Sequence, residues 1–282
     1  MRYFIKLSYD GTRFCGWQVQ PNALTVQECL EKSLSTLLKA RVSVVGAGRT
    51  DTQVNAVGYV AHFDFDGPVP QFLSDDAGEL DATKTGYKLN AILPKDIVVH
   101  DVWKVEGDLH ARFSATRREY TYFIHRTKDP FVGSHSYFCP WPLDVEAMNR
   151  AASYLVGTHD FRCFEKIGSD NRTSVCTVSE AGWFSYEPVG VSVLGLHAPG
   201  GTYMYFRISA DRFLRNMVRA VVGSLLEVGR GRRSVEDFAS LVLPVSTVSE
   251  ETGHIAEDGT PFRSMAGESV PGFALFLSDI RY

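Results

Sequence analysis

This sequence of 282 residues lacks several features that would directly identify a membrane protein, a disulfide-stabilised protein or a metal-binding protein. It has no run of about 18 or more apolar residues, so it holds no candidate membrane span. Its five cysteines are scattered and form no Cys-x-x-Cys pair, which argues against a disulfide framework and against a structural zinc site. Its eight histidines show no metal-ligand spacing. We therefore expect a cytoplasmic protein, in a reducing compartment, that holds no metal.

An excess of positive charge is also missing, because the formal net charge is −4. The basic residues are nevertheless gathered in two segments of the chain. One segment holds Arg112, Arg117, Arg118, Arg126 and Lys128, and the other holds Arg207, Arg212, Arg215, Arg219, Arg230, Arg232 and Arg233. A solvated surface explains a single cluster of this kind. Two clusters, each beside a motif described below, favour contact with nucleic acid.

Composition is ordinary for a globular protein, with 44% hydrophobic and 22% charged residues. The length exceeds that of a typical single domain and is sufficient for two domains of about 100–150 residues each. We expect an N-terminal subdomain over 1–107 and a C-terminal subdomain over 108–282.

Periodicity predicts the same kind of element order in both halves. The first half reads as strand 3–9, helix 26–39 after the capping box Thr25-x-x-Glu28, strands 42–45 and 57–65, helix 83–93 and strand 97–105. The second half reads as strand 117–124, helix 145–156, strands 175–186 and 203–210, helices 214–227 and 235–243, and strand 273–282. The pattern indicates an α+β fold of two units, each with a largely antiparallel sheet backed by helices.

The glycine-rich segment Gly46-Ala47-Gly48-Arg49-Thr50-Asp51 lies between two predicted strands. Its glycines let the backbone turn tightly and let a ligand approach closely. No Gly-Lys-Ser/Thr follows and no helix begins there, so the segment is not a phosphate-binding loop. Taken alone, it is a turn with an exposed arginine and aspartate.

This segment and several others resemble, in order, the motifs of the TruA family of tRNA pseudouridine synthases. The resemblance runs along nearly the whole chain. It rests on Tyr9-Asp10-Gly11-Thr12 with Phe14-x-Gly16-Trp17-Gln18, on Gly46–Asp51 with Val60-Ala61-His62-Phe63, on Leu89-Asn90-Ala91-Ile92-Leu93-Pro94, on His110-Ala111-Arg112-Phe113-Ser114-Ala115 with Arg118-x-Tyr120-x-Tyr122, and on Phe213-Leu214-Arg215-Asn216-Met217-Val218-Arg219.

The resemblance implies two ferredoxin-like (RRM-like) subdomains with largely antiparallel sheets joined across a central RNA-binding cleft. The first would carry the catalytic aspartate loop and the second the tyrosine and arginine motifs. It also implies a homodimer that grips tRNA and acts on uridines of the anticodon stem-loop, at about positions 38–40, after each base has left its stack.

The implied reaction breaks the N-glycosidic bond of uridine, rotates the uracil and rejoins it through carbon. No redox step or energy input is needed, so no cofactor is expected. A carboxylate suits the first step, and Asp51 is that carboxylate. It could attack the sugar carbon or the base ring, or take a sugar proton, and the sequence leaves these alternatives open.

Other site residues follow from the resemblance, position by position. Arg49 would hold the space that the flipped base vacates. Tyr120 would stack on uracil, a contact worth about 1–3 kcal/mol, and its hydroxyl could also take part in proton transfer. Tyr122 on the same strand face is expected to pack in the core. Arg219 would pair with Asp51 and keep it ionised.

Three further residues complete the expected RNA-binding set. Arg215, four positions before Arg219 on one helix flank, is a candidate phosphate contact. Arg112 belongs to the second motif and to a basic segment. Phe273 stands where the family usually has a leucine that packs near the base.

The sequence departs from the family directly after Asp51. The family usually continues Ala-Gly-Val-His-Ala, whereas this chain has Thr52-Gln53-Val54-Asn55-Ala56. Gln53 removes backbone freedom, and Asn55 changes the hydrogen-bonding options. The alternatives are a synthase with another target uridine and a catalytically silent RNA-binding relative. A glycosidic hydrolase would need a second carboxylate to activate water, and none stands out.

Overall fold

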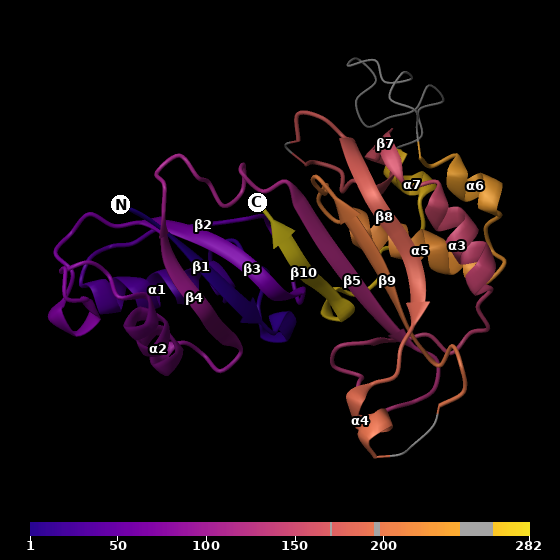
Figure 1. Cartoon of the computed structure of the whole chain (residues 1–282). Coiled ribbons are helices and arrows are strands. Elements are labelled where there is room, and N and C mark those ends of the chain that lie inside the picture. Colours follow the sequence, from indigo (N-terminus) through magenta and orange to yellow (C-terminus); the bar gives the residue numbers. More distant parts are fainter. Residues whose placement is uncertain (170, 195–197, 243–261) are drawn as a thin grey trace. The chain divides into compact units, whose positions relative to one another are not determined.

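The chain divides into two compact units in its computed structural model, which describes residues 1–169, 171–194, 198–242 and 262–282 (Figure 1). One unit comprises Met1–Thr116 with Phe276–Tyr282, and the other comprises Arg117–Leu275. Both combine helices with a mostly antiparallel sheet, which confirms the expected α+β class. Over the described ranges, no helix has the length and apolar character needed to cross a membrane.

The first unit follows the chain order β1-α1-β2-β3-α2-β4. Its elements are β1 (Arg2–Tyr9), α1 (Val26–Leu38), β2 (Val44–Gly46), β3 (Asn55–Asp64), α2 (Ala82–Ile92) and β4 (Ile97–Val105). These strands pair antiparallel in the order β4-β1-β3-β2. Strand β10 (Leu275–Arg281) joins the same unit by pairing in parallel with the start of β3, at Asn55 and Ala56.

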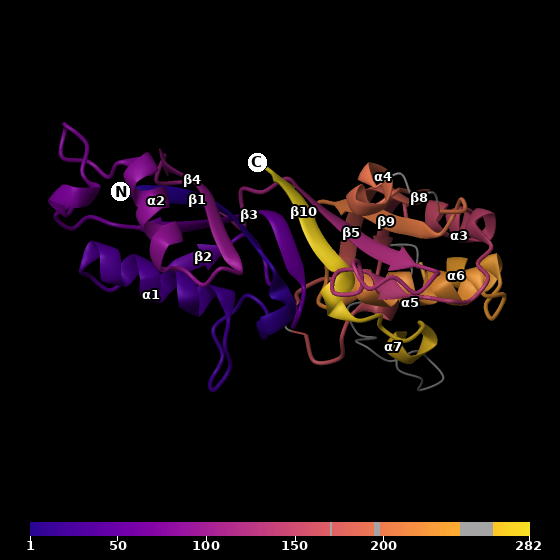
Figure 2. The same cartoon turned by 90° about the horizontal axis from the view of Figure 1, so that it is seen from below.

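Helix α1 forms where the sequence predicts it. The Thr25 hydroxyl accepts the Glu28 N–H at 3.4 Å, as the capping box requires, and Lys39 ends the helix in the left-handed conformation. Leucines at helical spacing give α1 a buried stripe. Helices α1 and α2 contact each other (Figure 2), so the unit has one helical layer and one sheet layer.

The second unit holds the remaining elements. These are β5 (Arg117–His125), β6 (Tyr137–Phe138), α3 (Val145–Ser153), β7 (Gly157–Asp160), β8 (Val175–Ser185), α4 (Val189–Val193), β9 (Tyr203–Ala210), α5 (Met217–Gly229), α6 (Val235–Ala239) and α7 (Phe262–Met265). The sheet order is β5-β9-β8-β7, with antiparallel neighbours, and β6 pairs in parallel with β5. Helices α3, α5 and α6 pack on one another, and α3 also packs against β8 (Figure 1).

Several helix boundaries differ from the expected ones, among them the end of α3, at Ser153 rather than at 156. Helix α5 begins at Met217 rather than at 214, because Asn216 has a φ of +66° and cannot continue a right-handed helix backwards. Its side-chain amide donates to the Ser269 hydroxyl at 2.6 Å. Helix α6 ends at Ala239, four residues before the expected end at position 243, which lies outside the described residues.

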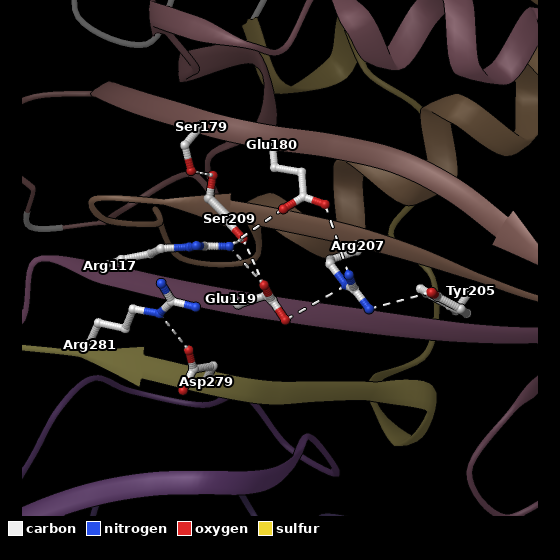
Figure 3. A network of polar contacts seen from close by, with 9 residues as sticks. All are labelled: Arg117, Glu119, Ser179, Glu180, Tyr205, Arg207, Ser209, Asp279 and Arg281. Carbon is white, nitrogen blue, oxygen red and sulfur yellow. Dashed lines mark hydrogen bonds and ion pairs between the residues drawn. The ribbon is translucent and has the colours of Figure 1, made fainter.

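Strand alternation places charged residues on the sheet face of the second unit that points away from Tyr120, Tyr122 and the helices. There Arg117 binds Glu119 at 2.9 Å and the Ser209 hydroxyl at 2.7 Å (Figure 3). Arg207 lies 3.7 Å from Glu119 and packs over the rings of neighbouring aromatic residues. Two arginines of the basic segments are thus engaged by carboxylates within the sheet.

Candidate active site

The loop that carries Asp51 lies between β2 and β3, and main-chain hydrogen bonds fix it. The Trp17 N–H donates to the Thr50 carbonyl at 3.2 Å, and the Gln53 N–H donates to the Phe14 carbonyl at 3.1 Å. The Val54 N–H closes the turn on the Asp51 carbonyl at 3.1 Å. Asp51 itself is half-buried. Its position is therefore set by the backbone of the segment at 14–17.

Side chains reinforce this loop from the strands behind it. The Thr50 and Tyr9 hydroxyls are hydrogen-bonded at 2.9 Å in a buried place, and the Tyr59 hydroxyl donates to the Gly48 carbonyl. Gly16 has a φ of +86°, and a Cβ there would lie 2.3 Å from the Thr50 carbonyl oxygen. Only glycine fits at this close approach.

The two departures from the family pattern have different structural consequences. Gln53 has a φ of +65°, so its backbone adopts the conformation for which glycine is suited. Asn55 is 1% exposed, and its side-chain oxygen accepts the Gly11 N–H at 2.8 Å. It therefore joins the end of the Asp51 loop to the turn after β1.

Two histidines of the first unit shape the turn that carries Arg112. The buried His62 accepts the Ala111 N–H at its Nδ1 atom, at 3.1 Å, and His110 accepts the N–H groups of Arg112 and Phe113 at 3.1 and 3.2 Å. Burial, with the nearby Arg2 and His110, lowers the pKa of His62 to about 4. Both rings act as acceptors, and burial also lowers the pKa of His110.

Tyr120 and Arg219 lie in the second unit, on β5 and α5. Tyr120 is 9% exposed, and its ring packs edge-on against Phe213 at 5.0 Å between centroids. Arg219 is half-buried, and its Nε–H donates to the Val270 carbonyl at 2.7 Å. The Val270 N–H returns a bond to the Arg219 carbonyl at 3.2 Å, which ties α5 to the segment before β10.

The remaining predicted residues are more exposed. Arg49 and Arg112 lie on the surface of the first unit, and Arg215 lies on the surface of the second, just before α5. Phe273 is half-buried in the 3₁₀ turn Gly272–Ala274. Among the described residues, no group of three or more His, Cys, Asp or Glu side chains could hold a metal ion.

Sequence reasoning missed the supporting roles of Asn55, His62 and His110. Each acts on a backbone N–H, and the partners of Asn55 and His62 lie 44 and 49 positions away in the chain. In the sequence, Asn55 stood out only as a departure from the family pattern, and His62 and His110 only as members of motifs. That signal does not distinguish an acceptor from a ligand.

A family model described as tRNA pseudouridine synthase matches residues 6–114 and 151–282. The chain belongs to this family. It is therefore an isomerase of the pseudouridine synthase class, and the expected family is confirmed.

Several relatives carry the name tRNA pseudouridine synthase A. The protein of Bacteroides fragilis is 43% identical over 281 residues, covering 100% of this chain and 96% of the relative. That of Parabacteroides distasonis is 42% identical over 283 residues, with the same coverage. That of Bacillus licheniformis is 37% identical over 286 residues, covering 100% of this chain and 99% of the relative.

A solved structure of a Cbf5-Nop10-Gar1 complex has a chain that is 13% identical, with a TM-score of 0.31. The match covers 79% of this chain and 45% of that chain. A likeness of this size carries no argument about fold or function.

Replacing Asn55 by alanine should destabilise the protein by about 1–3 kcal/mol, because the buried Gly11 N–H loses its acceptor. Chemical denaturation measures the free energy of unfolding. The matched control is Thr52→Ala, an exposed change in the same loop, which should stay within about 0.5 kcal/mol of wild type. Equal midpoints for the two variants would contradict the role of Asn55.

Replacing Gln53 by glycine should leave stability unchanged or raise it by up to about 1 kcal/mol, because glycine adopts a positive φ without steric cost. Replacing it by valine should lower stability by more than about 1 kcal/mol, since a β-branched residue is a strong outlier there. Thermal unfolding of both variants checks this. A valine variant as stable as the glycine variant would show that the loop is not held in this conformation.

The free energy of unfolding should fall as the pH drops from 6.5 to about 4, partly because of His62. The unfolded chain takes up a proton at the ordinary pKa of 6.5, whereas burial holds the folded pKa near 4. The contribution of neutral His62 is therefore complete above pH 6.5 and is lost towards pH 4. In His62→Gln the decline over this window should be smaller. An identical decline in both proteins would refute the assignment.

Proposed function

We propose that this chain isomerises uridine to pseudouridine in the anticodon stem-loop of tRNA, with Asp51 as its nucleophile. The observation that carries the proposal is the fixed Asp51 loop. It bears Gly46-Ala47-Gly48-Arg49-Thr50-Asp51 on a backbone held to the segment at 14–17. The relatives named tRNA pseudouridine synthase A support tRNA as the substrate.

The chemistry needs a carboxylate at a defined place rather than a cofactor. Asp51 either attacks the sugar carbon or the uracil ring, or takes a proton from the sugar. In each case the glycosidic bond breaks, the uracil turns, and a carbon–carbon bond replaces the carbon–nitrogen bond. The proton lost from carbon 5 goes to solvent, and N1, which has lost its bond to the sugar, takes up one proton from solvent. Any bond formed to Asp51 breaks before the product leaves.

Arg219, Tyr120 and Arg49 take the supporting roles in this proposal. Arg219 pairs with the Asp51 carboxylate and keeps it ionised. Its Nε anchor on Val270 supports that role, because the anchor holds the guanidinium in place and takes up only one of its five N–H donors. Tyr120 stacks on the uracil with its ring, and Arg49 holds the place that the base vacates.

The exposed arginines provide candidate RNA contacts. Arg112 lies over the ring of Phe113 at 5.6 Å, and that ring is 77% exposed. An arginine on an exposed aromatic ring suits both phosphate and base contact. Arg215 is a second candidate contact, and Phe273 is a candidate for packing near the base.

We also propose that both units are ferredoxin-like. The first unit supports this with its β-α-β-β-α-β order and sheet order β4-β1-β3-β2. The second has β5-α3-β8-β9-α5 in corresponding order, with the short strands β6 and β7 and the short helix α4 added between them. The subdomain division at 107, the RNA-binding cleft, the homodimer, the absence of a cofactor and the cytoplasmic location stay predictions.

Incubation with tRNA that carries tritium at carbon 5 of uridine tests the proposal. The wild type should release tritium and form pseudouridine, and Asp51→Asn should lower the rate by about 10³-fold or more. Asp66→Asn, an exposed aspartate of the same unit, is the matched control and should keep the wild-type rate.

The other outcomes each have a definite meaning. Free uracil would indicate hydrolysis. Binding of tRNA without tritium release by the wild type would indicate a silent RNA-binding protein. Substituting the anticodon-stem uridines by cytidine one at a time identifies the target, and release that survives all these substitutions would move the target elsewhere.

A further inference from the structure

Tyr122 is a fully buried tyrosine whose hydroxyl has no hydrogen-bond partner among the residues that the structure describes. It sits on β5 between Tyr120 and Ile124, on the face that the helices cover. Leaving a buried hydroxyl unsatisfied destabilises a fold, and phenylalanine would fill the same space without that cost. Packing alone therefore does not explain why this position is a tyrosine rather than a phenylalanine.

Other buried tyrosines of this chain satisfy their hydroxyls. Tyr59 donates to the Gly48 carbonyl, and Tyr9 is bonded to Thr50. Tyr203 donates to an Asp129 carboxylate oxygen at 2.7 Å. Tyr122 differs from these residues, because no residue in the described ranges pairs with its hydroxyl.

Arg219, on α5, is a charged residue whose charge affects the pKa of the Tyr122 hydroxyl. Burial raises the pKa of Tyr122 far above its usual range, and the nearby Tyr137 adds to this, whereas the Arg219 charge opposes it. Tyr122 therefore stays protonated and acts through hydrogen bonding rather than proton transfer. Arg219 is anchored at Nε by the Val270 carbonyl, so rotation about that anchor redirects its two terminal nitrogens.

We propose that Tyr122 is a positioning residue for Arg219, and that its hydroxyl accepts a hydrogen bond from the Arg219 guanidinium while RNA is bound. In the free protein no described residue forms a hydrogen bond with this hydroxyl. In the complex it fixes the direction in which Arg219 meets the Asp51 carboxylate. This role rests on the proposed function, and it differs from that of Tyr120, which faces the base.

Tyr122→Phe tests the role because it removes one oxygen atom and keeps the ring. Its Tm should equal or exceed that of the wild type, since an unsatisfied polar group is lost. Its affinity for tRNA should be unchanged. Its single-turnover rate of pseudouridine formation should fall about tenfold, the effect of one hydrogen bond to a charged group.

Tyr203→Phe is the matched control, because it removes a hydroxyl that has a partner in the free protein. Its Tm should fall while its rate stays that of the wild type. A wild-type rate for Tyr122→Phe would overturn the inference. So would a rate loss in Tyr122→Phe accompanied by a lower Tm, which indicates a purely structural role.

A spectroscopic measurement links the effect to Arg219 without relying on activity. Proteins labelled with ¹³C at the tyrosine ring carbon that bears the hydroxyl give a Tyr122 resonance, assigned by its loss in Tyr122→Phe. It should shift when saturating tRNA is added to the wild type and stay in place in Arg219→Lys, whose folding is checked by its Tm. A shift that persists in Arg219→Lys would overturn the inference.

These experiments distinguish failure of the proposed role of Tyr122 from failure of the proposed function. If the wild type forms pseudouridine and Asp51→Asn does not, while Tyr122→Phe behaves as the wild type, only the role of Tyr122 is lost. If the wild type forms no pseudouridine, the proposed function itself is lost.

Discussion

Close backbone contact between the turn after β1 and the Asp51 loop is the constraint on which the candidate site depends. A Cβ at Gly11 would lie 2.1 Å from the Val54 carbonyl oxygen, and a Cβ at Gly16 would lie 2.3 Å from that of Thr50. Main-chain bonds and the Asn55 amide then join the two segments. Because most of these contacts are made by main-chain atoms, the backbone that carries Asp51 is held by groups that have little freedom to move.

This constraint also explains how the loop tolerates its departures from the family pattern. Gln53 is held at a positive φ by its N–H bond to Phe14 and by the turn that Val54 closes. A residue that prefers another conformation is kept in place because its neighbours fix the backbone on both sides. Asn55 supplies the anchor to Gly11 with a side-chain oxygen where the family usually has an imidazole.

Sequence periodicity was sufficient for most elements, because buried positions recur at the spacing of a helix or strand. Helix α1 with its Thr25 cap is the clearest case. The predicted start of α5 was three residues too early, because the hydrophobic pattern does not show that Asn216 adopts the left-handed conformation. The roles of Asn55 and His62 depend on partners more than forty positions away, and such contacts leave no periodic signal. The clustering of basic residues in the sequence did not reveal that Arg117 and Arg207 form ion pairs with carboxylates of the sheet.

Strand β10 has a consequence for the order in which the protein matures on the ribosome. It pairs with β3 at Asn55 and Ala56, directly after the Asp51 loop, yet the entire second unit separates the two strands along the chain. The earlier strands of the first unit emerge first and can pair as they are made. Their sheet gains its last neighbour only after the second unit has been translated, and closing so long a loop costs entropy. The start of β3, which follows Asp51, is thus the last part of the first unit to be completed, and it lacks one neighbouring strand in a nascent chain until β10 has been made.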